Sequence, residues 1–262
     1  MARSGHPQSG YPLSRAEIGK FTRHGPIQEF FDYLATRDVI TVFDDFKQIA
    51  YDSNMWAVAN GGGAAVASFA VNLSSNGELR GTTGTGNGDT ASASLIGPKN
   101  WYGDAYASVE CKWSPITAVT ETKVEIGFVD VVPGSTKAIT NNIATPTVNT
   151  SVVDAAIDLY NHTSTTTTNE LVTIGSSITA AKTTFTAPTA VAAATAYTSR
   201  ILLVLNQVYL WRDGLKVVSH NAAATDYVEG GSAMAFWAYV RASNATSKSL
   251  DLDYVRISQE RV

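Results

Sequence analysis

Cysteine is almost absent from this sequence of 262 residues, in which Cys111 is the only one. A single thiol excludes an intrachain disulfide, and it also excludes a zinc site built from several cysteine ligands. The class of small, disulfide-stapled secreted scaffolds is therefore excluded. The chain must be stabilised by burial of a core or by assembly with other subunits.

Charged side chains are also scarce. Asp, Glu, Lys and Arg make up 16% of the residues, against about 25% in a typical soluble domain. The 19 basic and 23 acidic residues give a formal net charge of −4. A nucleic-acid binder needs an excess of basic residues to replace the counterions of the phosphate groups. We therefore expect no nucleic-acid partner.

Long apolar runs are missing as well. No stretch reaches the roughly eighteen apolar residues of a membrane-spanning helix, so we expect no such helix and no membrane partner. The N-terminal stretch MARSGHPQSGYPLSR lacks the apolar segment of a signal peptide. We expect the protein to be made in the cytoplasm of its host.

The residues that usually support metal or nucleotide chemistry show no suitable spacing. The glycine-rich stretch GTTGTGNGDTAS is not followed by a helical pattern that would present backbone amides to a phosphate. We interpret it as a turn between strands. The histidines are scattered, and none forms a metal-binding pair such as H-x-x-x-H: His6, His24, His162 and His220.

An N-terminal arm, residues 1–38, precedes the rest of the chain. Its Gly-, Pro- and Ser-rich beginning has no periodicity and predicts no stable fold alone, so we expect the arm to lie against a partner surface. Ser14 and Glu17 form a capping box that predicts a short helix, and Pro26 suits the start of a second one. The second helix carries an apolar stripe that packs either on its own chain or on a neighbour. These candidate docking residues are Ile27, Phe30, Phe31 and Leu34.

From Val39 onward the pattern becomes strand-like. Apolar and polar residues alternate in YASVECKW, TKVEIGFVDVV and MAFWAYVRA, and turns separate these segments. Strands with one apolar face predict packed antiparallel sheets. We expect an all-β protein, a two-sheet antiparallel jelly-roll sandwich over residues 39–262, preceded by the arm with one or two short helices. The Thr- and Ala-rich middle, residues 133–197, gives no clear pattern.

The stretch LVLNQVYLWRDGLKVVSH, residues 203–220, predicts a hairpin that turns at Asp213 and Gly214, because glycine accepts the positive φ of a tight turn. With GELRGTTGTG, KVEIGFVD, MAFWAYVRA and LDLDYVRIS, it makes residues 40–262 resemble the concanavalin A-like lectin/glucanase superfamily. The resemblance implies a jelly roll of two curved sheets, of the kind seen in tailed-bacteriophage virion proteins. In this superfamily the concave sheet often holds carbohydrate.

The hydrolases of the superfamily carry closely spaced acids, E-x-D-x-E or a near variant, on one concave strand, where paired carboxylates divide the acid and nucleophile roles. The nearest match is Glu121, Glu125 and Asp130 in TETKVEIGFVD. The last two are separated by an odd number of positions, so on a regular strand they point to opposite faces. The motif is absent, and we expect no enzymatic activity.

Aromatic residues that stack on sugar rings are candidates for a glycan site. Trp101 and Tyr102 lie between Pro98 and Gly103 in what we interpret as a loop, where such rings often serve binding. A tryptophan within a strand more often fills a core, so both interpretations stay open. The candidate glycan-binding residues are Trp101, Tyr102, Trp211 and Tyr239.

Acidic residues near both ends of the sandwich are candidates for a structural calcium site. If the first and last strands pair, Asp44, Asp251 and Asp253 come close together, and oxygen-rich clusters suit that ion. The other interpretation is that these acids are solvated at strand ends. We expect no other cofactor.

Taken together, these features favour a non-enzymatic structural protein of a tailed-bacteriophage virion. We expect a capsid decoration, cement or minor capsid protein, anchored through residues 1–38 to the major capsid protein or to other virion proteins. Many identical contacts in a multi-copy or homo-oligomeric assembly would stabilise the shell by avidity. The alternative is a carbohydrate-binding or adhesion module that binds a glycan of the host surface.

Overall fold

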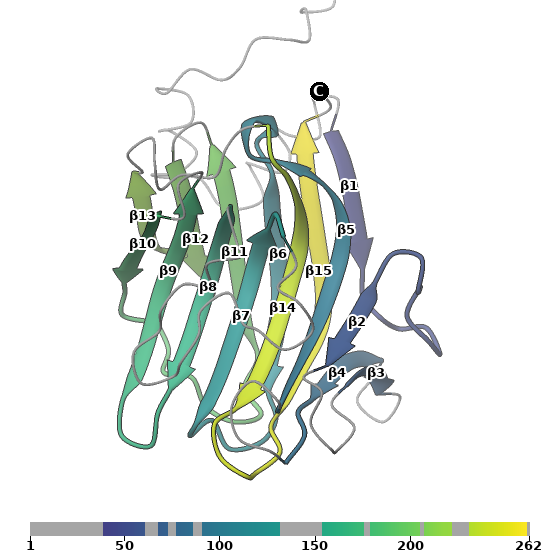
Figure 1. Ribbon diagram of the computed structural model, residues 1–262, viewed down its shortest axis with the longest axis vertical. Coiled ribbons are helices and arrows are strands. Elements are labelled where there is room, and N and C mark those ends of the chain that lie inside the picture. The colour runs from purple at the N-terminus through teal and green to yellow at the C-terminus, as the bar shows by residue number, and fades with distance from the viewer. Residues whose placement is uncertain are drawn as a thin grey trace, which may run out of the picture.

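Two antiparallel β-sheets pack face to face in the computed structural model (Figure 1). The two-sheet all-β sandwich predicted from the alternating pattern is therefore confirmed. The structure describes residues 39–60, 68–72, 77–85, 91–131, 154–175, 179–204, 207–221 and 231–260.

The larger sheet, called the eight-stranded sheet below, consists of β1 (Val39–Asp44), β3 (Ser68–Asn72), β4 (Glu78–Thr82), β6 (Ser108–Pro115), β11 (Tyr197–Val204), β12 (Gln207–Arg212), β13 (Leu215–Asn221) and β15 (Ser249–Glu260). The seven-stranded sheet consists of β2 (Ala57–Asn60), β5 (Ser92–Tyr102), β7 (Thr122–Val129), β8 (Ala155–His162), β9 (Thr167–Gly175), β10 (Thr179–Thr184) and β14 (Ala233–Ala242). A short 3₁₀ helix, Gly103–Ala105, follows β5.

The strand order shows that elements distant in sequence lie side by side. The eight-stranded sheet runs β13-β12-β11-β6-β15-β4-β3, with β1 paired to β15, and the seven-stranded sheet runs β10-β9-β8-β7-β14-β5-β2. The first and last strands pair antiparallel from Val39 opposite Glu260 to Asp44 opposite Val255. The eight-stranded sheet thus brings together the first and last strands of the domain.

The core lies between the sheets and follows the predicted alternation. On β6, Val109, Cys111 and Trp113 point inward and are buried. On β14 the inward positions include Met234 and Phe236, which are also buried. Each such large apolar side chain contributes about 1.5–3 kcal/mol when it is removed from water.

The predicted hairpin forms between β12 and β13. Asp213 has a φ of 53° and Gly214 a φ of 78°, so both central residues adopt the left-handed conformation that a type I′ turn requires. The backbone N–H of Asp213 donates to the carbonyl of Thr198 at 2.8 Å. The backbone N–H of Thr198 in turn donates to Asp213 Oδ1 at 2.9 Å. The turn is therefore tied to the neighbouring strand β11.

Two segments differ from the expectation. The described part of the Thr- and Ala-rich middle contains three strands, β8, β9 and β10, and its alanine run, residues 190–196, lies outside any strand. The expected loop at Trp101 and Tyr102 is wrong, because β5 continues to Tyr102. Pro98 is accommodated within this strand because the pairing of β5 with β14 is irregular at that point.

The helices and docking stripe predicted for residues 1–38 lie outside the described residues, and these predictions stay open. Most of the turn after GTTGT, residues 86–90, also lies outside them. In the part of the chain that the structure describes, no helix has the length and apolar character needed to cross a membrane.

Candidate functional site

The outer face of the seven-stranded sheet, turned away from the other sheet, is the place where the spaced acids of a hydrolase would lie. On β7 the side chains of Val124, Ile126 and Phe128 point into the core. The alternate positions are Lys123, Glu125 and Gly127, opposite Arg241, Tyr239 and Trp237 of β14. Lys123 and Glu125 point outward, whereas a Cβ atom at Gly127 would meet Ile201 of the core. These three alternate positions therefore hold one ammonium group, one carboxylate and no side chain.

Gly127 is fixed by its neighbours. A Cβ atom at this position would lie 2.0 Å from the backbone oxygen of Ala156 on β8. No side chain fits there without a shift of the backbone. The position cannot hold a second carboxylate.

The one carboxylate on the outer face of β7 is already engaged. Lys123 Nζ lies 3.7 Å from Glu125 Oε1, and both side chains are fully buried. The indole Nε1–H of Trp237 donates to Glu125 Oε2 at 3.1 Å. A general acid or nucleophile pair needs two carboxylates on either side of a bond, and this arrangement supplies one.

A large part of the remainder of this outer face is apolar and closed. The rings of Trp237 and Tyr239 stack with centroids 5.7 Å apart and an interplanar angle of 13°. Trp237 is 1% exposed. The stacked pair belongs to a buried apolar cluster that also includes Val129, Ala155, Ile157, Leu159, Val172 and Ile174. A ligand does not reach these rings in the conformation seen here.

The four predicted glycan-binding aromatic residues lie in different places. Trp101 is 2% exposed and packs in the core between the sheets. The backbone N–H of Tyr102 donates to the side chain of Gln259. Tyr239 lies on the closed face described above, whereas Trp211 lies half-buried on the outer face of the eight-stranded sheet. The structure does not bring these four residues together.

The three predicted calcium ligands each have a different partner. Asp44 accepts hydrogen bonds from Trp56 Nε1 at 2.7 Å and from the backbone of Phe46. Asp251 forms a bidentate pair with Arg80, and Asp253 pairs with Lys112 at 2.6 Å. Among the residues that the structure describes, no group of three His, Cys, Asp or Glu side chains is arranged to hold a metal ion.

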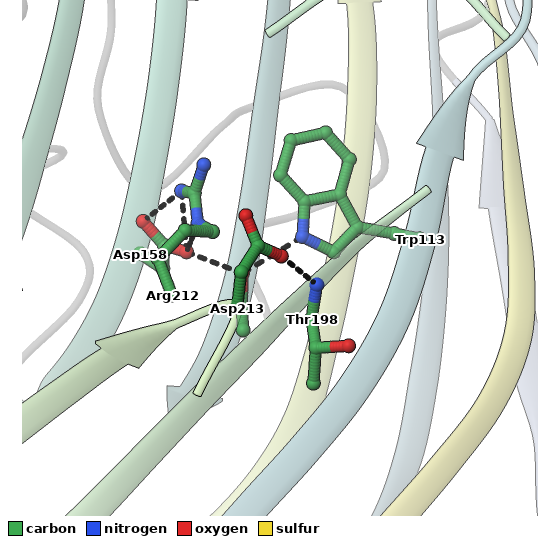
Figure 2. A network of polar contacts seen from close by, with 6 residues as sticks. Trp113, Asp158, Thr198, Arg212 and Asp213 are labelled. Carbon is green, nitrogen blue, oxygen red and sulfur yellow. Dashed lines mark hydrogen bonds and ion pairs between the residues drawn. The ribbon is translucent and has the colours of Figure 1, made fainter. Parts of the chain in front are cut away.

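A buried polar network between the sheets is the feature that the sequence analysis missed. Figure 2 shows the guanidinium of Arg212, from β12, paired with Asp158, from β8, through contacts of 2.6–3.1 Å. Ser199 Oγ donates to Asp158 at 2.5 Å and accepts from Trp113 Nε1 at 2.7 Å. The guanidinium carbon also lies 5.1 Å from the centroid of the Trp113 ring. The network joins one strand of the seven-stranded sheet to three strands of the other.

The signal for this network was present in the alternation. Leu210 points inward and Trp211 outward, so Arg212 points inward although it adjoins the turn. On β8, Asp158 shares its face with the core residues Ala156 and Tyr160. Two inward charges of opposite sign on facing strands predict a buried pair.

The outer face of the eight-stranded sheet carries a band of aromatic and charged side chains, which are partly exposed except for the buried Arg200. We call it the outer band, and it comprises Phe43, Glu110, Lys112, Arg200, Trp211, Asp253 and Tyr254. Tyr254 Oη donates to Glu110 Oε1 at 2.8 Å. Burial and the Glu110 carboxylate raise the pKa of Tyr254. Burial lowers the pKa of Arg200 to about 10, so the guanidinium stays charged at neutral pH.

No protein-family model matches the sequence, and no curated protein matches it. Solved structures are similar in fold. The catalytic domain of an endo-1,3-β-glucanase (laminarinase) from Thermotoga petrophila RKU-1 has 13% identity and a TM-score of 0.55, over 86% of this chain and 100% of that chain. Rv0315, a pseudo β-1,3-glucanase of Mycobacterium tuberculosis, has 12% identity and a TM-score of 0.58, over 86% and 100%.

A carbohydrate recognition domain is similar in fold as well. The carbohydrate recognition domain of Emp47p has 8% identity and a TM-score of 0.53, over 84% of this chain and 95% of that chain. Identities this low show the fold alone. The chain has the concanavalin A-like lectin/glucanase jelly-roll fold, as the resemblance in its sequence implied.

Proposed function

We propose that this protein is a non-catalytic carbohydrate-binding or adhesion module. The observation that carries the non-catalytic part is strand β7, where Lys123, Glu125 and Gly127 occupy the alternate positions. Lys123 lies beside the carboxylate of Glu125, and the backbone of Ala156 fills the space that a side chain at position 127 would need. Hydrolysis of a glycosidic bond by paired carboxylates has no second carboxylate on this strand.

The carbohydrate-binding part is supported by the fold. The similar structures include a carbohydrate recognition domain, glucanases and a pseudo β-1,3-glucanase. A jelly roll that has lost a catalytic pair keeps sheet faces on which rings and hydrogen-bonding groups can stand at fixed spacing. Half-buried aromatic side chains next to charged groups are present here on the outer band. Such surfaces combine stacking on sugar C–H faces with hydrogen bonds to hydroxyls.

The test has two arms that use the full chain. A glycan array followed by calorimetric titration of the best ligand measures binding, and reducing-end release from soluble β-1,3-glucan measures hydrolysis. We expect saturable binding of at least one glycan and no release of product. Absence of binding to every glycan would refute carbohydrate recognition. Turnover that is lost in Glu125→Gln but kept in Asp45→Asn, at a partly exposed acid outside this face and outside the outer band, would refute the non-catalytic assignment.

A structural role in a phage virion is the second candidate, and one observation favours it. The outer face of the seven-stranded sheet, where this fold often holds carbohydrate, is closed, with Trp237, Tyr239 and Glu125 all buried. A module whose usual ligand face is closed can serve as a wall or spacer in an assembly. Cosedimentation of the full chain with tailed-phage capsids, compared with a chain lacking residues 1–38, tests this role. Equal cosedimentation of both chains, or none of either, would refute docking through the arm.

A further inference from the structure

We infer that the outer band is an oligosaccharide-binding site, with Tyr254, Asp253 and Lys112 at its centre and with Phe43 and Trp211 at its two ends. The inference deepens the proposed function and rests on it. It assigns the ligand to the outer face of the eight-stranded sheet and not to the closed face of the seven-stranded sheet.

A β-bulge in β15 presents two consecutive side chains on the same face of the sheet. The register of β15 against β6 shifts between Leu252, opposite Trp113, and Tyr254, opposite Lys112. Asp253 is the extra residue. Leu252 points into the core, and the bulge turns both Asp253 and Tyr254 outward. Bulges that re-aim side chains are over-represented next to functional sites.

One positively and one negatively charged side chain are held in place beside Tyr254. Lys112 Nζ and Asp253 Oδ2 lie 2.6 Å apart, with 39% and 34% of their side chains exposed. The Tyr254 hydroxyl is held by Glu110. An ammonium donor and a carboxylate acceptor at one point match the paired hydroxyls of a sugar ring, which donate and accept together.

Aromatic rings lie at both ends of the outer band. The ring of Phe43, which is 58% exposed, lies 5.9 Å from that of Tyr254, centroid to centroid. Across the sheet, the Arg200 guanidinium lies 5.5 Å from the centroid of the half-buried Trp211 ring. Four strand spacings separate β1 from β12 through β15, β6 and β11, which is about 19 Å at about 4.8 Å per strand. This span suits a chain of several sugar units and exceeds a monosaccharide.

The two sheets differ in a way that decides between their outer faces. The aromatic pair of the seven-stranded sheet, Trp237 and Tyr239, is almost fully buried. In the outer band, Phe43 is largely exposed and Trp211 and Tyr254 are partly exposed. Stacking on a sugar requires an accessible ring. The outer band meets this requirement without any change of conformation.

The experiment uses the full chain and the best ligand from the glycan array. Phe43→Ala and Trp211→Ala each remove one ring, and we expect the dissociation constant to rise about tenfold in each, which corresponds to the loss of one stacking contact. Phe43→Tyr and Trp211→Phe keep a ring and should restore most of the affinity. Leu215→Ala, at an exposed position of the same sheet outside the band, is the matched control and should bind like the wild type.

Folding is checked separately, by the midpoint of thermal unfolding of every variant. If both alanine variants bind the glycan with the dissociation constant of the wild type, the assignment of the site is overturned and the proposed function still stands. A wild type that binds no glycan would overturn both. An equal loss in the alanine variants and in their aromatic counterparts would show an effect on the fold and would also overturn the site.

Discussion

Two ion pairs of this protein use the same chemistry in opposite surroundings. Arg212 and Asp158 lie between the sheets with at most 1% of either side chain exposed, and Ser199 also donates to the carboxylate. Lys112 and Asp253 lie on the outer band with about a third of each side chain exposed. The buried pair has no access to a ligand and joins the two sheets. The exposed pair adds little to stability and is available for recognition.

The difference in burial between the two ion pairs indicates which of them can contact a ligand. A buried charge is costly unless it is paired and hydrogen-bonded, so its partners are fixed by the fold. A half-exposed pair can exchange part of its contact for a ligand at small cost. Substitutions in the two pairs should therefore separate stability from binding.

The largest effect is expected for the buried pair. Arg212→Met leaves the Asp158 carboxylate buried without its cation, and we expect a loss of about 3–5 kcal/mol in the free energy of unfolding. Urea denaturation measures it. The double variant Arg212→Met with Asp158→Leu removes both charges and should recover most of the loss. A single variant within about 1 kcal/mol of the wild type would show that the pair does not join the sheets.

The second largest loss in the free energy of unfolding is expected for a substitution on β7 of the seven-stranded sheet. Gly127→Ala places a Cβ atom against the backbone oxygen of Ala156, and we expect a loss of about 3 kcal/mol, the upper part of the range for overpacking. Gly214→Ala is the matched control, because it also sits at positive φ but in open space. We expect it to lose only about 1 kcal/mol. Equal losses in urea denaturation would mean that the contact at Ala156 is not tight.

Alkaline pH gives a smaller effect, which compares Tyr160 in the core between the sheets with Tyr254 on the outer face of the eight-stranded sheet. Burial and the Glu110 carboxylate raise the pKa of Tyr254. Burial and the nearby Tyr197 raise the pKa of Tyr160. The folded chain therefore keeps protons that the unfolded chain loses. Stability is fully present below the ordinary tyrosine pKa of about 10 and falls above it, by at most about 1.4 kcal/mol per pH unit for each group.

The measurement is urea denaturation of the wild type and two variants between about pH 8 and pH 11. Tyr254→Phe and Tyr160→Phe should each flatten the decline above about pH 10. A variant that declines as steeply as the wild type would show that its tyrosine ionises alike in the folded and unfolded chain.

The smallest effect is expected for the exposed pair. Lys112→Ala and Asp253→Ala should each change the free energy of unfolding by about 0–1 kcal/mol. A double-mutant cycle isolates the coupling between the two side chains. A coupling above about 2 kcal/mol would place this pair with the buried one and remove the contrast between them.

Much of the fold follows from sequence alone, because period-two alternation directly reports which side chains face the core. The strand MAFWAYVRA was predicted on this basis, the Asp213-Gly214 turn was predicted from the tolerance of glycine for positive φ, and both are confirmed. Strands β8 to β10 were not recognised, because Thr and Ala have no contrast in hydropathy to reveal a face. Trp101 was placed in a loop because of Pro98, whereas an irregular register in β5 accommodates the proline.

The sites were harder to predict because they depend on which strands are neighbours. Arg212 on β12 and Asp158 on β8 have three other strands between them along the chain, so the alternation shows that each side chain faces inward but not that the two meet. The outward turn of Asp253 depends on a bulge that only the register against β6 reveals. The outward position of Trp211 was predictable because a hairpin is a local feature, whereas Glu110 and Tyr254, on strands further across the same sheet, were not proposed as site residues.

The central claim is that a glycan binds to the outer face of the eight-stranded sheet and is not cleaved. Backbone hydrogen exchange of the full chain, with and without the best glycan of the array, tests it most directly. We predict slower exchange in β6, β12 and β15 and no change in β7 and β14. Protection confined to β7 and β14 would place the ligand on the opposite sheet and contradict the claim.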